Sequence, residues 1–426
     1  MNRKKVVIDS YFKLILTSSV VAILSTLLAF SIKELTEFFE SNIFNFAKEN
    51  ATYLYIILPS IGITIIYFLR KHLFQNKKNK GITEIYKTLD DRKEHLPFYK
   101  VPSHYLNGFL TVIFGGSTGV EVSTVVATAA LGNKVYKRNF SARQYKRELI
   151  CAGVAAGIAV LFTSPLTGWL FAMEVIARKI SKTLVISCSV AALIAGTFTY
   201  FFDQTTILSF EVESWNWYAL PFFLILSILG GSLSVYFTFL VTRMKPLFSK
   251  FPNDFFRVAV GAVAVGLMIF FFPSLYGDSY EGLESVLHSS MSPSSIPIAI
   301  LFVLAILKPL ASSLTLGAGG DGGVFAPSIV AGSFLGLMFA SFCNQYFEMD
   351  LILLNFALIG AAATLSASIY APLTSLILVC NLLPNGYNLF LPMLVCCFVA
   401  MLFSKVLLPY NVYNHHVYMA KHGIKQ

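Results

Sequence analysis

Residues 115–121 read GGSTGVE, and residues 319–325 read GGDGGVF. Each glycine cluster interrupts an otherwise apolar stretch, the first of which runs from Val101 to Asn133. The 33 residues of that stretch are too many for one membrane span of about 20 residues and too few for two full spans. Because glycine permits sharp turns and close approach, we expect the chain to turn back at each cluster.

The composition of the whole chain is that of a membrane protein. Of its 426 residues, 56% are hydrophobic and only 13% are charged, and the mean hydropathy is +0.69. We count about ten apolar stretches of span length, from Leu14–Ile32 to Asn388–Pro409. A soluble enzyme is therefore excluded, and an all-α, multi-pass integral protein of the cell (plasma) membrane is predicted. The first stretch is too long for a signal-peptide core and lacks a cleavage site, so we expect it to remain as a span.

The distribution of basic residues predicts the topology. Nine Lys and Arg residues lie from Arg70 to Lys100, and six more lie from Lys134 to Arg147 with no acidic residue among them. Basic loops stay on the cytoplasmic side, so both loops are expected there, together with both termini. Acidic residues flank the second glycine cluster and indicate external loops. The two clusters are therefore expected to enter the membrane from opposite faces.

The two clusters belong to an internal repeat. Alignment of Gly115–Gly132 with Gly319–Gly336, at an offset of 204, gives eight identities in eighteen positions. A second match, at an offset of 207, places Pro165–Thr167 on the identical tripeptide Pro372–Thr374. Duplicated halves of opposite orientation, each with an interrupted span, are typical of inverted-repeat transport proteins.

One membrane domain over residues 1–426 is expected. Its first repeat would cover about 1–200, its second, inverted repeat about 201–413, and a short cytoplasmic tail 414–426. Only thirteen residues follow Tyr413, so no appended cytoplasmic regulatory domain is expected.

Helices that break inside a bilayer can form a binding site for an anion. Broken backbone there must line an enclosed or watery cavity, and a helix that starts at the break points its positive end into that cavity. Such helix starts bind anions. The alternative is that the glycines only let helices pack closely, which is the role we favour for Gly153 and Gly157.

No other chemistry is indicated. The six cysteines lie in apolar stretches without CxxC spacing, which suggests neither a disulfide framework nor a zinc site. There is no HExxH motif, and none of the seven histidines pairs convincingly with a nucleophile. We therefore expect no enzyme activity, no cofactor, no metal and no nucleic-acid partner.

Several motifs resemble those of the CLC family of chloride channels and proton-coupled anion antiporters. Residues Gly322–Pro327 match the family's GGxFxP. Residues Gly116–Glu121 fall where the family carries GREGP, and Gly81–Glu84 fall where it carries GSGIPE. Pro165–Glu174 resembles the segment that ends in paired glutamates, and Tyr413 falls near the pore tyrosine. The resemblance spans nearly the whole chain in order and implies an inverted-repeat CLC-type fold with broken, re-entrant helices.

The resemblance also implies a homodimer with one anion pore per subunit, in a lipid bilayer. In this family the anion is held by backbone amides together with serine and tyrosine hydroxyls. The anion-binding and pore residues expected here are Lys80, Gly116, Ser117, Thr118, Gly119, Val120, Gly323, Val324, Phe325, Ala326 and Tyr413. Tyr410 competes with Tyr413 for the place of the pore tyrosine.

Two departures from the family pattern bear on the mechanism. The gating glutamate of GREGP falls at Thr118, whose hydroxyl cannot act as a protonatable carboxylate. Glu121, about one helical turn later, is the other gate candidate, unless it is only a partner of the helix dipole. The internal proton-relay glutamate of the antiporters falls at Val175, which cannot carry a proton.

Three further charged residues have open roles. Lys80 stands in place of the pore serine, where its ammonium would attract anions, or else it is one more cytoplasmic lysine. Lys308, inside an apolar segment, is expected to snorkel or to pair. Asp321 is expected to cap the helix that follows it.

The favoured function is a passive transmembrane channel for chloride or a similar small anion. Thr118 and Val175 both favour it, because each replaces a carboxylate that proton coupling needs. The alternative is a proton-coupled chloride or anion antiporter that uses Glu121 as a displaced gating carboxylate.

Overall fold

The computed structural model describes residues 3–77, 79–91, 93–138, 144–251, 253–292 and 296–423. Within these ranges the chain forms helices and no strands, so the predicted all-α fold is confirmed. Seven of the described helical segments are long and apolar enough to cross a membrane, and three shorter ones are also apolar. The expected multi-pass membrane protein is confirmed.

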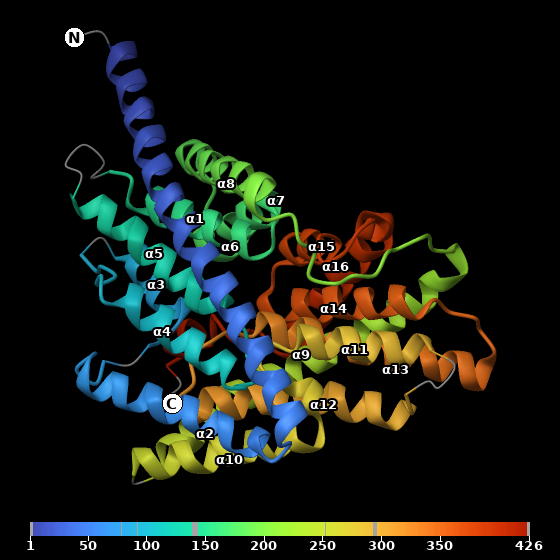
Figure 1. The fold of residues 1–426 in the computed structure, drawn as a ribbon. Helices are drawn as coiled ribbons and strands as arrows, with labels where there is room; N and C mark the ends of the chain where they lie inside the picture. Colours follow the sequence, from blue (N-terminus) through green and yellow to red (C-terminus); the bar gives the residue numbers. More distant parts are fainter. Residues whose placement is uncertain are drawn as a thin grey trace. The chain divides into compact units, whose positions relative to one another are not determined.

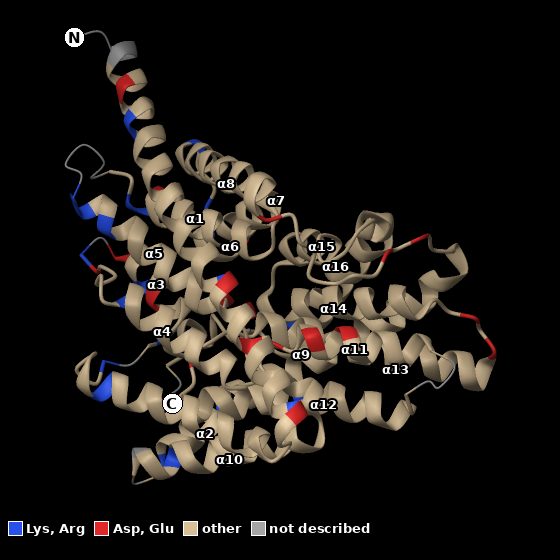
Figure 2. Ribbon diagram, viewed as in Figure 1, with Lys and Arg blue, Asp and Glu red and all other residues tan. Residues whose placement is uncertain are grey.

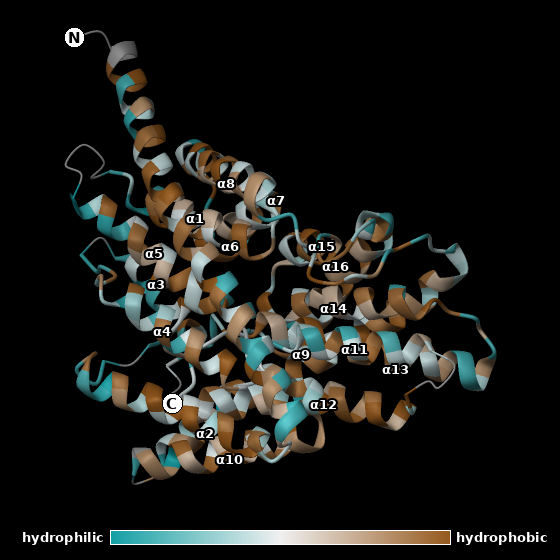
Figure 3. Ribbon diagram, in the orientation of Figure 1, coloured by the Kyte–Doolittle hydropathy of each residue, from teal (hydrophilic) through white to brown (hydrophobic). Residues whose placement is uncertain are grey.

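Charged residues are sparse along these helices. Figure 2 shows that most of the ribbon carries no Asp, Glu, Lys or Arg, and Figure 3 shows hydrophobic residues along the same helices. Many large apolar side chains are exposed on helix surfaces, among them Phe12, Leu193 and Val406. Surfaces of this kind suit contact with lipid rather than water.

The described chain folds as two compact units, each built from segments that are discontinuous in sequence. The first unit is Met1–Leu35, Lys78–Leu106 and Glu121–Thr205. The second unit is Thr36–Lys77, Asn107–Val120 and Thr206–Gln426. Helices α1 (Arg3–Asn50) and α4 (Lys100–Ile113) contribute residues to both. The boundaries of the two sequence repeats are a separate matter and stay a prediction.

The first unit is built on the packing of α5 (Glu121–Arg138), α6 (Lys146–Leu161) and α8 (Lys182–Phe202), shown in Figure 1. Its further helices are α3 (Ile82–Asp90), α7 (Pro165–Phe171) and the π-helix η2 (Ala172–Ala177). The hydroxyls of Ser164 and Ser181 cap the starts of α7 and α8 by accepting hydrogen bonds from first-turn amides. Gly153 and Gly157 both lie against Thr128 of α5, which confirms their predicted packing role.

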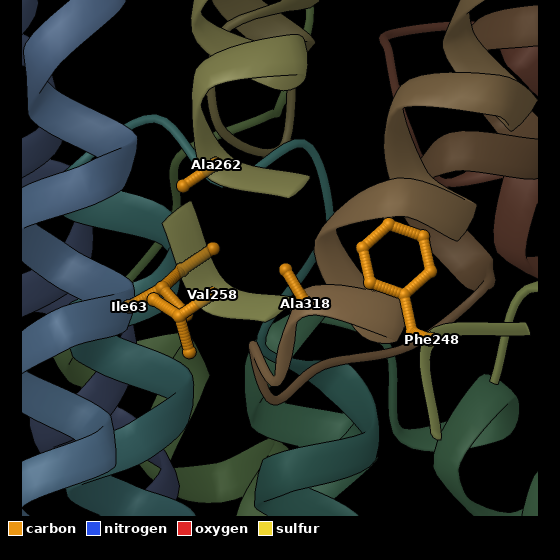
Figure 4. Close-up of a cluster of buried hydrophobic side chains, with 5 residues drawn as sticks. All are labelled: Ile63, Phe248, Val258, Ala262 and Ala318. Carbon is orange, nitrogen blue, oxygen red and sulfur yellow. The ribbon is translucent and has the colours of Figure 1, made fainter. Parts of the chain in front are cut away.

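The second unit contains the remaining helices. They are α2 (Leu54–His72), α9 (Leu220–Ser249), α10 (Asp254–Phe271), α11 (Tyr280–Met291), α12 (Ile298–Ala318), α13 (Phe325–Phe347), α14 (Leu353–Ile369), α15 (Pro372–Cys380), α16 (Phe390–Leu407) and α17 (His415–Lys421). Helices α2, α9, α10 and α12 meet in an apolar cluster of Ile63, Phe248, Val258, Ala262 and Ala318, shown in Figure 4. Ala318 is the last residue of α12, so this cluster supports the helix end that leads into the second glycine turn.

A close helix contact of one kind occurs in both units. An ideal Cβ at Gly132 of α5 would lie 2.2 Å from the carbonyl oxygen of Leu149 of α6. One at Gly336 of α13 would lie 2.0 Å from the carbonyl oxygen of Phe356 of α14. Gly132 and Gly336 correspond at the offset of 204, so the repeat seen in the sequence is also a repeat of helix packing.

Candidate anion-binding site

The two glycine turns lie against each other within the second unit. Gly119 and Gly323 form an isolated antiparallel bridge, in which the Gly323 amide donates to the Gly119 carbonyl oxygen at 3.2 Å. The Thr118 hydroxyl donates to the Gly323 carbonyl oxygen at 2.7 Å. All three residues are buried. Two segments that are 204 residues apart in sequence therefore form one structural centre.

Each turn begins with the same backbone hydrogen bond. The Gly116 amide donates to the carbonyl oxygen of Thr111 at 2.7 Å, and the Gly320 amide donates to that of Thr315 at 2.9 Å. Both threonines lie near the end of the helix that leads into their turn, Thr111 in α4 and Thr315 in α12. The two turns thus have the same local construction.

The threonine hydroxyls then join each turn to the other. The Ser117 amide donates to the Thr315 hydroxyl at 3.2 Å, and the Asp321 amide donates to the Thr111 hydroxyl at 2.9 Å. Adding 204 to the number of Ser117 and subtracting 204 from that of Thr315 turns the first contact into the second. The two turns are therefore related by an approximate twofold exchange, as expected of inverted repeats.

A helix starts immediately after each bridged glycine. Helix α5 begins at Glu121 and α13 begins at Phe325, each two residues after its glycine. The N-cap residue of α13 is Val324, whose own side chain makes no capping hydrogen bond. First-turn amides lie at the positive end of a helix and lack partners within it. Both helix starts are thus of the kind that binds anions.

The structure gives the two gate candidates different places. Glu121 is the first residue of α5, is only 4% exposed, and corresponds to Phe325 at the 204-residue offset. Thr118 precedes the bridge, and its hydroxyl is bonded to Gly323. The sequence alignment already contained this signal, because it matched Gly119 with Gly323 and so placed Glu121 at a helix start.

Tyr413 lies beside the start of α13. Its ring centroid is 6.2 Å from that of Phe325, and both residues are buried. Tyr410 packs instead against the rings of His415 and Tyr418. The geometry therefore assigns the place next to the α13 start to Tyr413 rather than to Tyr410.

Asp321 does not cap α13 as the sequence predicted, because the N-cap residue is Val324, three residues later. Asp321 is 7% exposed. An ideal Cβ at nearby Gly319 would lie 3.6 Å from Arg70 Nη1 and 3.9 Å from Arg257 Nη2. Two guanidinium groups therefore lie beside the second glycine turn, where they favour negative charge.

The start of α3, in the first unit, depends on a buried lysine that the sequence did not single out. The Lys80 amide donates to the Glu84 carboxylate at 2.7 Å, whereas the side chain of Lys80 is exposed. The Lys100 ammonium, 3% exposed, donates to Glu84 at 2.8 Å and to Asn79 Oδ1 at 3.1 Å. Lys100 therefore holds the turn that carries Lys80 and leads through Gly81 into α3.

Replacement of Lys100 by methionine is expected to destabilise this turn. The substitution takes the ammonium from the largely buried Glu84 carboxylate, at a cost of about 3 kcal/mol. Thermal unfolding of the detergent-solubilised protein measures the effect. Lys87→Met, which removes an exposed lysine on α3, is the matched control. Equal unfolding temperatures for the two variants would contradict the assigned role of Lys100.

Val175 lies buried in the π-helix η2. Its carbonyl oxygen accepts a hydrogen bond from the Tyr86 hydroxyl at 3.1 Å, and the Arg178 guanidinium lies 3.4 Å from the Tyr86 ring centroid. A π-helical turn is rare and often occurs at functional sites. The side chain of Val175 is nevertheless aliphatic, so position 175 itself offers no group that could carry a proton.

The chain is similar in sequence and in structure to known chloride channels and chloride/proton transporters. The family described as voltage gated chloride channel matches residues 61–405. The H(+)/Cl(−) exchange transporter ClcA of Yersinia pestis is 26% identical over 83% of this chain and 75% of its own length. The voltage-gated ClC-type chloride channel ClcB of Escherichia coli is 28% identical over 75% of each chain. The crystal structure of a slow cyanobacterial Cl⁻/H⁺ antiporter, 22% identical, superposes with a TM-score of 0.80 over 97% of this chain and 98% of its own.

Proposed function

This chain belongs to the voltage-gated chloride channel family, and from that membership we propose that it exchanges chloride, or a similar small anion, for protons across the membrane. Relatives named H(+)/Cl(−) exchange transporters, in Yersinia and in Vibrio cholerae, support exchange. The passive channel favoured by the sequence therefore takes second place to its alternative.

The position of Glu121 carries this proposal. It begins α5 two residues after the bridged Gly119, in the same position that Phe325 holds in α13. A carboxylate at such a start is a tethered anion that competes with a free anion for first-turn amides. Protonation removes its charge and with it this competition. One residue then responds to both transported species, which is what exchange requires.

The anion itself is proposed to be held in the second unit. The amides of Val324 and Phe325 at the start of α13 are its main ligands, and the Tyr413 hydroxyl is a further one. The turn Thr118–Val120 completes the site from the other repeat, and Lys80 attracts anions at the cytoplasmic mouth. Partners in this proposal are a second copy of the chain, with one pore per subunit, and the lipid bilayer, with both termini cytoplasmic.

A passive anion channel is the second candidate, and Val175 favours it. This residue is buried in η2. The family resemblance implies that it takes the place of the proton-relay glutamate of the antiporters, and its side chain cannot bind a proton. Exchange in this protein must therefore bring cytoplasmic protons to Glu121 without a carboxylate at position 175. A channel needs no such route.

Transport by the purified full-length protein in liposomes tests the two candidates. With a chloride gradient as the only driving force, we expect protons to move against their own gradient, and the reversal potential to depend on pH as well as on chloride. Protein-free liposomes set the background leak. Chloride flux at the chloride Nernst potential, unaffected by a pH gradient and without proton movement, would instead establish the channel.

A further inference from the structure

The loop between α10 and α11 packs onto the first glycine turn, within the second unit. The Tyr276 hydroxyl donates to the carbonyl oxygen of Ile113 at 2.6 Å. An ideal Cβ at Gly115, where φ is +81°, would lie 2.6 Å from Tyr276 Cε2, so only glycine fits under this ring. The Ser279 hydroxyl donates to the Tyr276 carbonyl oxygen at 2.9 Å and so holds the loop in shape.

Lys308 of α12 joins this loop to the glycine turn. Its ammonium is fully buried and donates to the Gly277 carbonyl oxygen at 3.0 Å, to Ser279 Oγ at 2.6 Å and to Ser117 Oγ at 2.9 Å. The prediction that Lys308 pairs is confirmed, and the alternative that it snorkels is wrong. A buried ammonium is costly unless its donors are satisfied, so the surrounding groups hold it firmly.

Carboxylates lie on the loop side of this ammonium. The Asp278 amide donates to Glu40 Oε1 at 3.1 Å, which ties the loop to α1. Burial raises the pKa of the Asp278 carboxyl, while the Tyr280 amide and the Lys308 ammonium oppose that rise. On the turn side the ammonium meets the hydroxyl of Ser117. Lys308 therefore stands between an acidic loop and the turn that precedes α5.

We propose that Lys308 is a positioning residue for the anion site, fixing Ser117 and placing a positive charge behind the first glycine turn. The proposal rests on the proposed transport of anions. Ser117 directly precedes Thr118, whose hydroxyl bonds to Gly323, and lies two residues before Gly119 of the Gly119–Gly323 bridge. A shift of Ser117 is therefore passed to the bridge through Thr118. A nearby buried cation also lowers the energy of an anion at the helix starts, because such charges are weakly screened.

Chloride flux into liposomes, measured over a range of chloride concentrations, tests this role. We expect Lys308→Met to raise the apparent KM for chloride about tenfold, because charge and contact are both lost. Lys308→Arg, which keeps the charge and can donate to Ser117, should stay within about threefold of the wild type. Ser117→Ala removes only the contact and should raise KM about threefold.

A second buried lysine provides the matched control. Lys33 forms an ion pair with Asp203 at 2.5 Å in the first unit, so Lys33→Met should lower stability and leave the KM for chloride unchanged. An unchanged KM in Lys308→Met would overturn the positioning role. If that variant fails to fold, an unchanged KM in Ser117→Ala would do the same. Absence of any anion flux through the wild-type protein would instead reject the proposed function, so the two failures are distinguishable.

Discussion

Replacement of Glu121 by glutamine is expected to abolish proton-coupled exchange and to leave an uncoupled anion flux. Glutamine keeps the size of the side chain at the start of α5, but it neither binds a proton near neutral pH nor carries a negative charge. The tethered competitor for the helix-start amides is then permanently neutral. Simultaneous recording of proton and chloride movement into liposomes measures the coupling directly.

An exposed glutamate elsewhere in the chain controls for loss of a carboxylate. Glu34 lies exposed on α1, and Glu34→Gln should keep the wild-type ratio of protons to anions. If Glu121→Gln still drove protons uphill at that ratio, Glu121 would not be the proton-binding gate. The proton carrier would then have to be sought elsewhere in the chain.

Insertion of a single methyl group at Gly322 is expected to reduce anion transport at least tenfold. An ideal Cβ at this position would lie 2.5 Å from both Cγ2 and Oγ1 of Thr118 and 2.9 Å from the Gly119 carbonyl oxygen. Relief of the clash must separate the two turns and so displace the start of α13. Overpacking of this kind costs about 1–3 kcal/mol. About 1.4 kcal/mol corresponds to a tenfold change, and initial anion flux into liposomes measures it.

A compensating substitution separates this local effect from a general loss of folding. Thr118→Ala removes the two atoms nearest to the added methyl group, so the double variant with Gly322→Ala should recover part of the flux. Recovery is expected to be incomplete because the Gly119 carbonyl oxygen remains close. If the single Gly322→Ala variant transported normally, the bridge between the two turns would not be part of the anion site.

Sequence patterns predicted the membrane fold because each apolar stretch or glycine run indicates its own structure without reference to distant parts of the chain. The long apolar stretches specify helices that must satisfy their backbone hydrogen bonds within the bilayer. The glycine runs at residues 115–119 and 319–323 predicted where these helices break, and the structure has a turn at each. The packing roles of Gly153 and Gly157 were also predictable, since small residues recur wherever membrane helices approach closely.

The gate assignment shows how one sequence can support two interpretations. The GREGP pattern can be placed on the glycine of Gly116-Ser117-Thr118 or on the glycine two residues before Glu121, because both have glycine in the same relative position. The structure distinguishes these two placements of the pattern. Helix α5 begins at Glu121, and the glycine that pairs with Gly323 is Gly119. The cap predicted at Asp321 was wrong for a related reason, since the first helical residue cannot be read from a run of glycines.

Composition, hydropathy and internal similarity were thus sufficient for a duplicated helical membrane protein with anion-favouring breaks, because they depend on neighbours within a few turns of chain. The contact between Lys308 and Ser117 joins residues 191 positions apart, and the Thr111 and Thr315 hydroxyls cross between repeats. Contacts of this kind depend on how whole helices pack, and no local pattern specifies them. The buried positions of Lys100 and Lys308, among 32 basic residues, became apparent only once the helices were assembled.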